Sequence, residues 1–226
     1  TVLCRHFGID HIETAEDIAS DTFLTAIDVW SYKGIPDNPT ALLYTVAKHK
    51  ATNYRARIKS FQDKVLPSVD IEQSYQPDID LSADNIQDSQ LQMLFAICHP
   101  SIPAESQIGL ALRILCGFGI DEIANAFLSN KETINKRLFR AKEKLRLEQV
   151  RIELPSEPAI GERLETVLTT LYLLFNEGYY SESKDAVLRE DLCDEAMRLT
   201  QLLTENKRTN LPAVNALLAL MCFHSS

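Results

Sequence analysis

Basic and amide side chains crowd the segment 131–151, where they could contact the phosphates and base edges of DNA. The segment carries eight Lys or Arg and three Asp or Glu, a net charge of +5 in a chain whose formal charge is −9. Basic side chains bind phosphates, and amide or ammonium groups pair with purine edges. An ordinary surface helix with solvated lysines is the alternative, but the local reversal of charge favours DNA.

The candidate DNA contacts in this segment differ in their chemistry. Thr133, Arg137 and Arg140 suit phosphates, whereas Asn135 and Lys136 suit base edges. The one aromatic side chain among them could touch a thymine methyl group or dock against another part of the protein. The set predicted to face DNA is Lys131, Thr133, Asn135, Lys136, Arg137, Phe139, Arg140 and Lys144.

Two helices separated by a tight turn must position these side chains. Apolar residues recur at helical spacing on both sides of a break at 128–130, where Ser129 or Asn130 can cap the second helix. In the second helix the apolar residues lie opposite the basic ones, so the pattern predicts a helix-turn-helix. The apolar residues are Ile120, Ile123, Ala124 and Phe127, and then Ile134, Leu138, Ala141 and Leu145.

A second basic segment, 48–64, carries six Lys or Arg against one acidic residue. The helix that contains it is predicted to start at Pro39 with Asn38 as its cap, after a loop over 31–37. An earlier helix with an apolar stripe is expected to pack beside it. The predicted stripe is Ala15, Ala19, Phe23, Ala26, Ile27 and Trp30, and the later helix is predicted to bury Leu42, Leu43, Val46, Ala47 and Tyr54.

The composition indicates an all-α chain without a membrane span. Only seven of the 226 residues are glycine, and no run of apolar residues is long enough to cross a bilayer. The five cysteines are far apart and form no CxxC pair. We therefore expect buried free thiols rather than a disulfide framework or a zinc site. With no visible signal peptide, these features predict a cytoplasmic protein.

Prolines and charge divide the chain into parts. Residues 65–90 carry six acidic side chains and no Lys or Arg, which suggests a flexible linker between two basic modules. Pro155 and Pro158 mark the start of a tail with a net charge of −6 over residues 153–226. The predicted parts are a first module at 1–61, a linker at 62–87, a second module at 88–151 and a tail at 155–226.

Further helices are expected in the second module and in the tail. Pro103 is predicted to open a helix through Leu115, and Gly178 is predicted to end the first tail helix in a left-handed conformation. The strongly apolar run near the C-terminus suggests that the tail is incomplete. An earlier helix is predicted to bury Leu91, Leu94, Phe95 and Cys98, and the tail helices are expected at about 160–176, 187–204 and 212–223.

Three motifs in order resemble those of an extracytoplasmic-function (ECF) sigma factor of the sigma-70 family. AEDIASDTFLTAIDVW (Ala15–Trp30) resembles the region 2 helix that binds the polymerase clamp. NPTALLYTVAKHKATNYRAR (Asn38–Arg57) resembles the promoter-melting helix, and residues 117–146 resemble region 4. The tail, with LLFNEGYYSE at Leu173–Glu182, looks like the tetratricopeptide-like extension of one subgroup.

The resemblance implies a transcription initiation factor that binds core RNA polymerase and promoter DNA. Region 2 would melt the −10 element, region 4 would read the −35 element, and the extension would regulate the factor or bind an anti-sigma protein. The usual Trp of the melting helix is Leu43 here, so stacking would fall to a nearby tyrosine. The residues implied at the clamp are Asp17, Ser20, Asp21 and Phe23, and those implied near the −10 element are Tyr32, Lys33, Asp37, Asn38, Tyr44, Lys48, Asn53, Arg55 and Arg57.

Two other classes of function are open to the sequence. A stand-alone helix-turn-helix regulator would bind duplex DNA without polymerase. A helical scaffold or an enzyme would need a motif that the chain lacks, since it has no HExxH, no Gly-rich phosphate loop and no Cys/His pair. We therefore expect no catalysis, cofactor or metal. The acidic tail is also expected to cover the basic helices in the free protein.

Overall fold

Helices make up all the regular structure in the part of the chain that the computed structural model describes. That part is the backbone of residues 1–65, 79–180 and 186–225, with side chains except at 59–65, 180 and 186–189. The all-α prediction is therefore confirmed. The chain divides into two compact units, one holding residues 2–85 and the other residues 86–226 together with Thr1.

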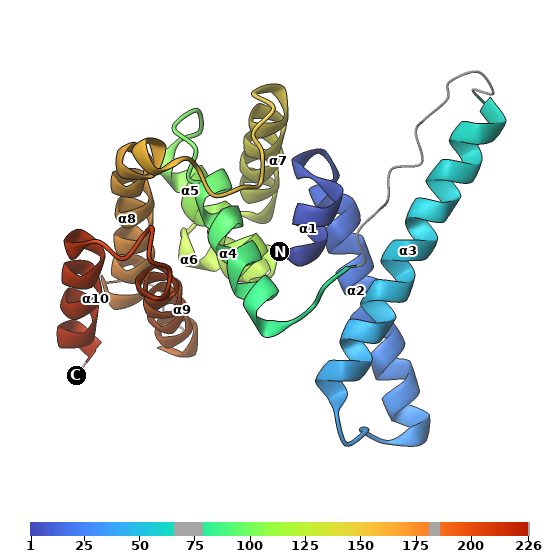
Figure 1. Ribbon diagram of the computed structural model, residues 1–226. Helices are drawn as coiled ribbons and strands as arrows, with labels where there is room; N and C mark the ends of the chain where they lie inside the picture. The colour runs from blue at the N-terminus through green and yellow to red at the C-terminus, as the bar shows by residue number, and fades with distance from the viewer. Residues whose placement is uncertain (66–78, 181–185, 226) are drawn as a thin grey trace. The chain divides into compact units, whose positions relative to one another are not determined.

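The first unit is built around a helical hairpin (Figure 1). A short helix α1 (Val2–Phe7) and a 3-10 turn η1 (Ile9–His11) lead into α2 (Ile12–Lys33), which packs against α3 (Pro39–Val65). The Asn38 side chain accepts a hydrogen bond from the Ala41 backbone N–H at 3.0 Å, so the predicted cap before Pro39 is confirmed. The predicted loop over 31–37 is shorter than expected, because α2 continues through Lys33.

The buried face of α2 differs from the predicted stripe. Phe23 and Ile27 are 58% and 57% exposed, so the prediction that they pack in the core is wrong. Thr22 takes the core position next to Phe23, and its hydroxyl donates to the Ile18 carbonyl at 2.7 Å, which leaves no unpaired polar group inside. The buried residues of α2 are Ile12, Ala15, Ile18, Thr22 and Ala26.

In α3 the predicted core residues are only half-buried. Ala51, which the apolar pattern did not single out, is fully buried, and no other side chain described in α3 is. A small side chain allows α2 and α3 to approach closely at that point, so larger neighbours contact the partner helix at the edges of the interface. The half-buried side chains are Leu42, Leu43, Val46, Ala47 and Tyr54.

The second unit begins with α4 (Ala83–Ile97), whose C-terminal half is deeply buried. Leu91, Leu94, Phe95 and Cys98, at and just beyond the end of α4, are buried as predicted. Burial raises the pKa of the Cys98 thiol to about 12, so this cysteine is a neutral thiol. The other helices are α5 (Ala104–Leu110), which continues as the π-helical turn η2 (Ala111–Leu115), then α6 (Ile120–Ala126), α7 (Lys131–Leu147), α8 (Glu157–Tyr180), α9 (Ala186–Glu205) and α10 (Pro212–Ser225).

The tail consists of α8, α9 and α10, which stack side by side (Figure 1). Gly178 lies inside α8, which continues to Tyr180, so the predicted left-handed cap at this glycine is wrong. Cys222 is exposed on α10, which corrects the expectation that all five cysteines are buried. Within the described ranges, none of the helices combines the length and the apolar character that a membrane span requires.

A buried hydrogen-bond network joins the tail to the helix-turn-helix half of the same unit. The Thr170 hydroxyl of α8 donates to the Gln107 side chain of α5 at 2.8 Å. The Gln107 amide nitrogen in turn donates to the carbonyls of His99 and Ile102, at 3.1 and 3.0 Å. Thr170 and Gln107 are 0% and 4% exposed, so water cannot hydrogen-bond to their side chains. The network supplies the partners that these buried polar groups need.

The substitution Thr170→Val should destabilise the second unit by about 1–3 kcal/mol, because it leaves the buried Gln107 carbonyl without its partner. The matched control Thr169→Val changes an exposed residue of the same helix. It should shift the free energy of unfolding by no more than about 0.5 kcal/mol. Urea unfolding followed by circular dichroism measures both values, and an equal decrease in the two variants would contradict the role of the network.

Candidate nucleic-acid interface

The helix α7 begins at a tight turn that follows α6. The Asn130 side chain accepts a hydrogen bond from the Thr133 backbone N–H at 2.8 Å, which decides between the two predicted caps. The turn itself requires a left-handed residue, and Leu128 takes this conformation with a φ of 46°. The Ser129 N–H then bonds to the Ala124 carbonyl at 2.8 Å, which satisfies the end of α6.

The inner side of α7 packs on α5 and α6. Gly109 of α5 faces Leu138, and a Cβ added to this glycine would lie 3.0 Å from the Leu138 Cδ2 atom. A larger residue would therefore require the Leu138 side chain to shift. The predicted buried side of α7, which is Ile134, Leu138, Ala141 and Leu145, is confirmed.

The outer side of α7 is open to solvent and carries most of the predicted DNA contacts. Lys136 and Arg140 are exposed, and within the described residues neither has an ion-pair partner. Phe139 is 57% exposed on the same outward side. The described residues of the tail therefore leave this side of α7 uncovered, contrary to the expectation from the tail's charge. The exposed candidates are Lys131, Thr133, Asn135, Lys136, Phe139, Arg140 and Lys144.

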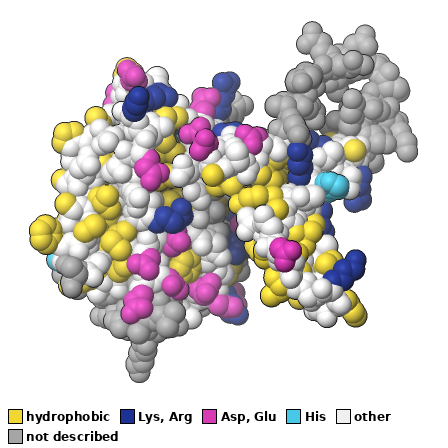
Figure 2. Space-filling model, turned by 60° about the horizontal axis from the view of Figure 1, so that its bottom comes forward, with side chains coloured by type: hydrophobic (Ala, Val, Ile, Leu, Met, Phe, Trp, Pro, Cys, Tyr) yellow, Lys and Arg dark blue, Asp and Glu magenta, His cyan; other side chains and the backbone are white. Residues whose placement is uncertain are grey.

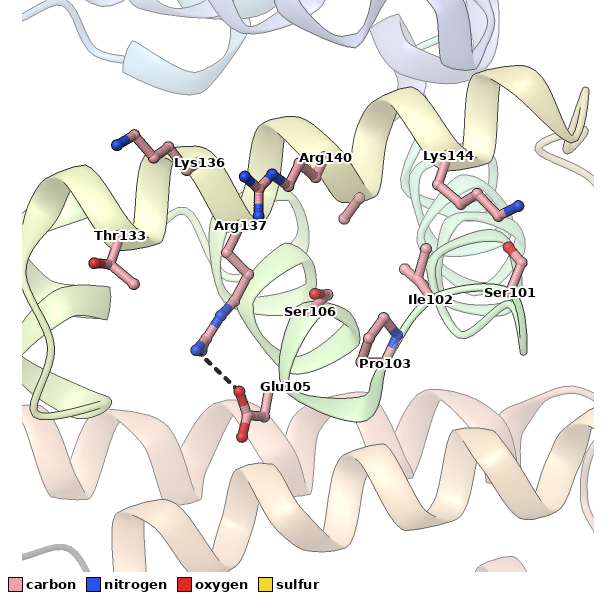
Figure 3. Close-up of a pocket in the computed structure, with 11 residues that line it drawn as sticks. Ser101, Ile102, Pro103, Glu105, Ser106, Thr133, Lys136, Arg137, Arg140 and Lys144 are labelled. Atoms are coloured by element: carbon pink, nitrogen blue, oxygen red, sulfur yellow. Dashed lines mark ion pairs between the residues drawn. The ribbon is translucent and has the colours of Figure 1, made fainter.

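Arg137 differs from the other candidates because it is held by internal contacts. Its guanidinium group pairs with the Glu105 carboxylate of α5 at 2.9 Å (Figure 3). The same group lies 5.6 Å from the centre of the Phe127 ring, within range of a cation–π interaction. The geometry therefore makes Arg137 a residue that positions α7 on α5, in addition to any contact with phosphate.

Two further bases of α7 have acidic partners at the surface. Lys131 pairs with Asp121 of α6 at 2.5 Å, and Lys144 pairs with Glu148 at 2.7 Å. The hydrogen bond from Lys144 holds the pKa of the Glu148 carboxyl below its usual value. Exposed pairs of this kind contribute little to stability and exchange readily for other anions.

A basic groove runs along one flank of α7, and Figure 3 shows the side chains that line it. The groove has a volume of about 490 Å³. Its opposite wall is the start of α5 together with the turn before it, which includes Ser101 and Pro103. The sequence analysis did not find this wall, since it lies about 30 residues from α7 along the chain. The bases that line the groove are Lys136, Arg137, Arg140 and Lys144.

In the first unit, the predicted residues near the turn of the hairpin are exposed. Tyr32 is 91% exposed near the end of α2, and Ile35 beside it is 73% exposed. Tyr44 is only 39% exposed, and Lys48 one turn later is half-buried. The remaining exposed candidates are Lys33, Asp37, Asn38, Asn53 and Arg57.

Arg55 is tied to α1 rather than projecting freely from α3. Its guanidinium group donates to the His6 carbonyl at 3.1 Å and lies 5.6 Å from the centre of the Phe7 ring. Tyr54 makes an edge contact with the same ring. Partial burial, helped by the Arg55 charge, lowers the pKa of His6. The interpretation of Arg55 as a DNA contact therefore competes with a structural role.

The outward face of α2 combines acidic and apolar side chains. Asp17, Ser20 and Asp21 are exposed, and Asp21 lies 3.7 Å from Lys50 of α3. Leu24 is 60% exposed and follows Asp21 by one turn. Figure 2 shows apolar side chains open to solvent on the hairpin, and Phe23 is among the exposed ones by its accessibility. Large exposed apolar patches are typical of surfaces that bind another protein.

Comparison with known proteins gives two matches. A family of unknown function, DUF6596, matches residues 163–226, which lie in the tail. A curated protein of Rhizobium meliloti (strain 1021), described as uncharacterized, is 33% identical over 206 residues. The match covers 89% of this chain but 48% of that protein, so the chain spans about half the length of its relative. No solved structure gives a significant match.

The substitution Arg137→Ala should lower the free energy of unfolding by about 1 kcal/mol, because it removes a half-buried ion pair and a cation–π contact. The matched control Arg140→Ala removes the same group from an exposed site and should change stability by less than about 0.5 kcal/mol. Chemical unfolding of the two variants side by side is the measurement. Equal stability of the two would contradict the positioning role of Arg137.

Proposed function

We propose that this chain is a sigma factor of the extracytoplasmic-function group, which gives RNA polymerase its promoter specificity. The proposal assigns sigma region 2 to residues 1–61, the linker to 62–87 and region 4 to 88–151. The tail at 155–226 is then a regulatory extension. In this scheme α7 reads the −35 element, α3 opens the −10 element, and α2 binds the polymerase clamp.

The observation that carries the proposal is the outward side of α7. Lys136 and Arg140 project to solvent from the second helix of a helix-turn-helix, in a chain with a formal charge of −9. A helix held from behind by a continuous apolar seam can enter the major groove without losing its packing. The groove beside it offers further cationic groups to the phosphates that border the major groove.

The first unit supports the same proposal with a second basic surface. Lys48 and Arg57 lie on α3, and Tyr32 projects near the turn of the hairpin. Aromatic side chains stack on unpaired bases, while basic side chains follow the phosphates of a single strand. A stand-alone regulator of duplex DNA has no use for this second surface.

The acidic and apolar face of α2 supports binding to a protein partner with a basic rim. Leu24 lies between Asp21 and Asp28 on the outward side, three and four residues away from them. An apolar centre surrounded by charge is the usual arrangement of a protein–protein interface. This face suits the clamp of core RNA polymerase.

The variant Arg140→Ala should weaken duplex binding about equally for all sequences, whereas Lys136→Ala should weaken binding and also relax the preference for one base. Each variant that removes a cation from a phosphate should also reduce the salt slope of binding by about 1. The control Lys207→Ala removes one exposed base from the tail and should leave affinity and slope unchanged. Fluorescence anisotropy at several salt concentrations measures both quantities. A slope that is the same in all variants would contradict contact between α7 and phosphate.

The double variant Asp17→Lys/Asp21→Lys should no longer bind bacterial core RNA polymerase, because it reverses the charge of the α2 face. The control Glu162→Lys/Glu165→Lys makes the same change in charge on exposed positions of α8. It should still co-elute with the core enzyme in size exclusion.

Failure of the unmodified chain to bind core polymerase, with duplex binding intact, would overturn the sigma assignment. The chain would then be a stand-alone helix-turn-helix regulator. An equal decrease of binding in both double variants would contradict a specific role for α2.

A further inference from the structure

A short segment before α4 lies against α3. Residues 79–82, here called the strap, have no helical structure, yet Ile79 is only 7% exposed. Ile79 and the next two residues line a hollow of about 420 Å³ together with Tyr44, Thr45 and Lys48 of α3. The strap and α3 belong to the same compact unit, so this contact is internal to the first unit.

Hydrogen bonds hold the strap in a defined conformation. The Asp80 carboxylate accepts from the Ser82 backbone N–H at 2.9 Å and from the Ser82 hydroxyl at 3.1 Å. The Asn85 amide donates to the Asp80 carbonyl and accepts from Arg5 of α1. The segment is thus attached at one end to α1 and inserts its apolar residue beside α3.

Two side chains beside the strap, Tyr44 and Lys48, are among those that the resemblance implies near the −10 element. Tyr44 and Lys48 are one helical turn apart, so a base on the ring would place its phosphate near the ammonium group. The strap presents an apolar side chain, Ile79, followed by a carboxylate, Asp80. A nucleotide likewise combines an apolar face, its base, with a negative charge, its phosphate. The ring of Tyr44 can bind the first and the ammonium group of Lys48 the second.

We propose that the strap is an intramolecular competitor of single-stranded DNA on α3. This inference rests on the proposed function and adds a means of regulating it. In the free chain the strap occupies the Tyr44 and Lys48 surface and lowers its apparent affinity for an unpaired strand.

The test uses Ile79→Asn, which removes the apolar anchor without changing the charge. Ala83→Asn, an exposed position at the start of α4, is the matched control. Hydroxyl-radical footprinting of the full chain reports the exposure of Tyr44 in the tryptic peptide that spans residues 34–48. The peptide that contains Tyr172, which is 43% exposed in the second unit, is the internal reference.

A second measurement uses a fluorescent single-stranded oligonucleotide and anisotropy. Ile79→Asn should raise the oxidation of Tyr44 and tighten binding, by about tenfold if the strap is docked in roughly nine molecules out of ten. Adding Lys48→Ala should reverse the increase in affinity. The control Ala83→Asn should match the unmodified chain in both measurements.

The two measurements separate the possible failures. Unchanged oxidation of Tyr44 in Ile79→Asn would show that the strap does not cover Tyr44, and this would overturn the proposal whatever the chain binds. Increased oxidation with no increase in affinity, and no effect of Lys48→Ala, would overturn competition with DNA. That second result would also count against the role of α3 in the proposed function, while leaving the docking of the strap established.

Discussion

The second unit depends on α5 being packed on two sides at once. One side faces α7, where Gly109 allows close approach, and another faces α8. The buried part of such a helix cannot leave a polar side chain unpaired, because water does not reach it. The side chain of Gln107 meets this constraint. Its amide oxygen accepts a hydrogen bond from α8, and its amide nitrogen donates to carbonyls of the turn that precedes α5. The tail is therefore part of the core that positions α7.

This arrangement divides the basic side chains of α7 into two groups. Arg137 points toward α5, where Glu105 and Phe127 hold it, and it stabilises the packing of α7. Lys136 and Arg140 are exposed and have no acidic partner among the described residues. Unpaired cations on a rigid element raise the local potential without losing free energy to internal pairing. The surface best suited to an anionic ligand is thus the one that the fold itself does not use.

The sequence predicted best those features whose cause lies within a few residues. The buried side of α7 follows from a helical repeat, and the caps at Asn38 and Asn130 follow from local hydrogen bonds. The sequence predicted burial and helix ends poorly where a contact with a distant segment determines them. Thr22 rather than Phe23 faces the core, and the bond from its hydroxyl to the Ile18 carbonyl satisfies the polar group there without explaining which side of α2 is covered.

Distance along the chain explains the other errors and omissions. Gly178 remains helical because α8 packs along α9, which overrides the local tendency of glycine to end a helix. The groove beside α7 needs Ser101 and Pro103, and no local pattern connects them to α7. Likewise, periodicity in α3 gave no reason to expect that Ile79 would lie beside it.

The distribution of charge would allow a polyanion to approach only a few surfaces of this chain. A polyanion is repelled by a protein with a formal charge of −9 unless it meets a local concentration of bases. Two segments, 48–64 and 131–151, each have a net charge of +5 and lie in different compact units. Repulsion by the rest of the chain therefore penalises wrong orientations, and at low salt this effect is strongest. The acidic surfaces of such a protein would thus make binding of a polyanion selective for orientation. Only an approach to one of the two basic segments would give a favourable interaction.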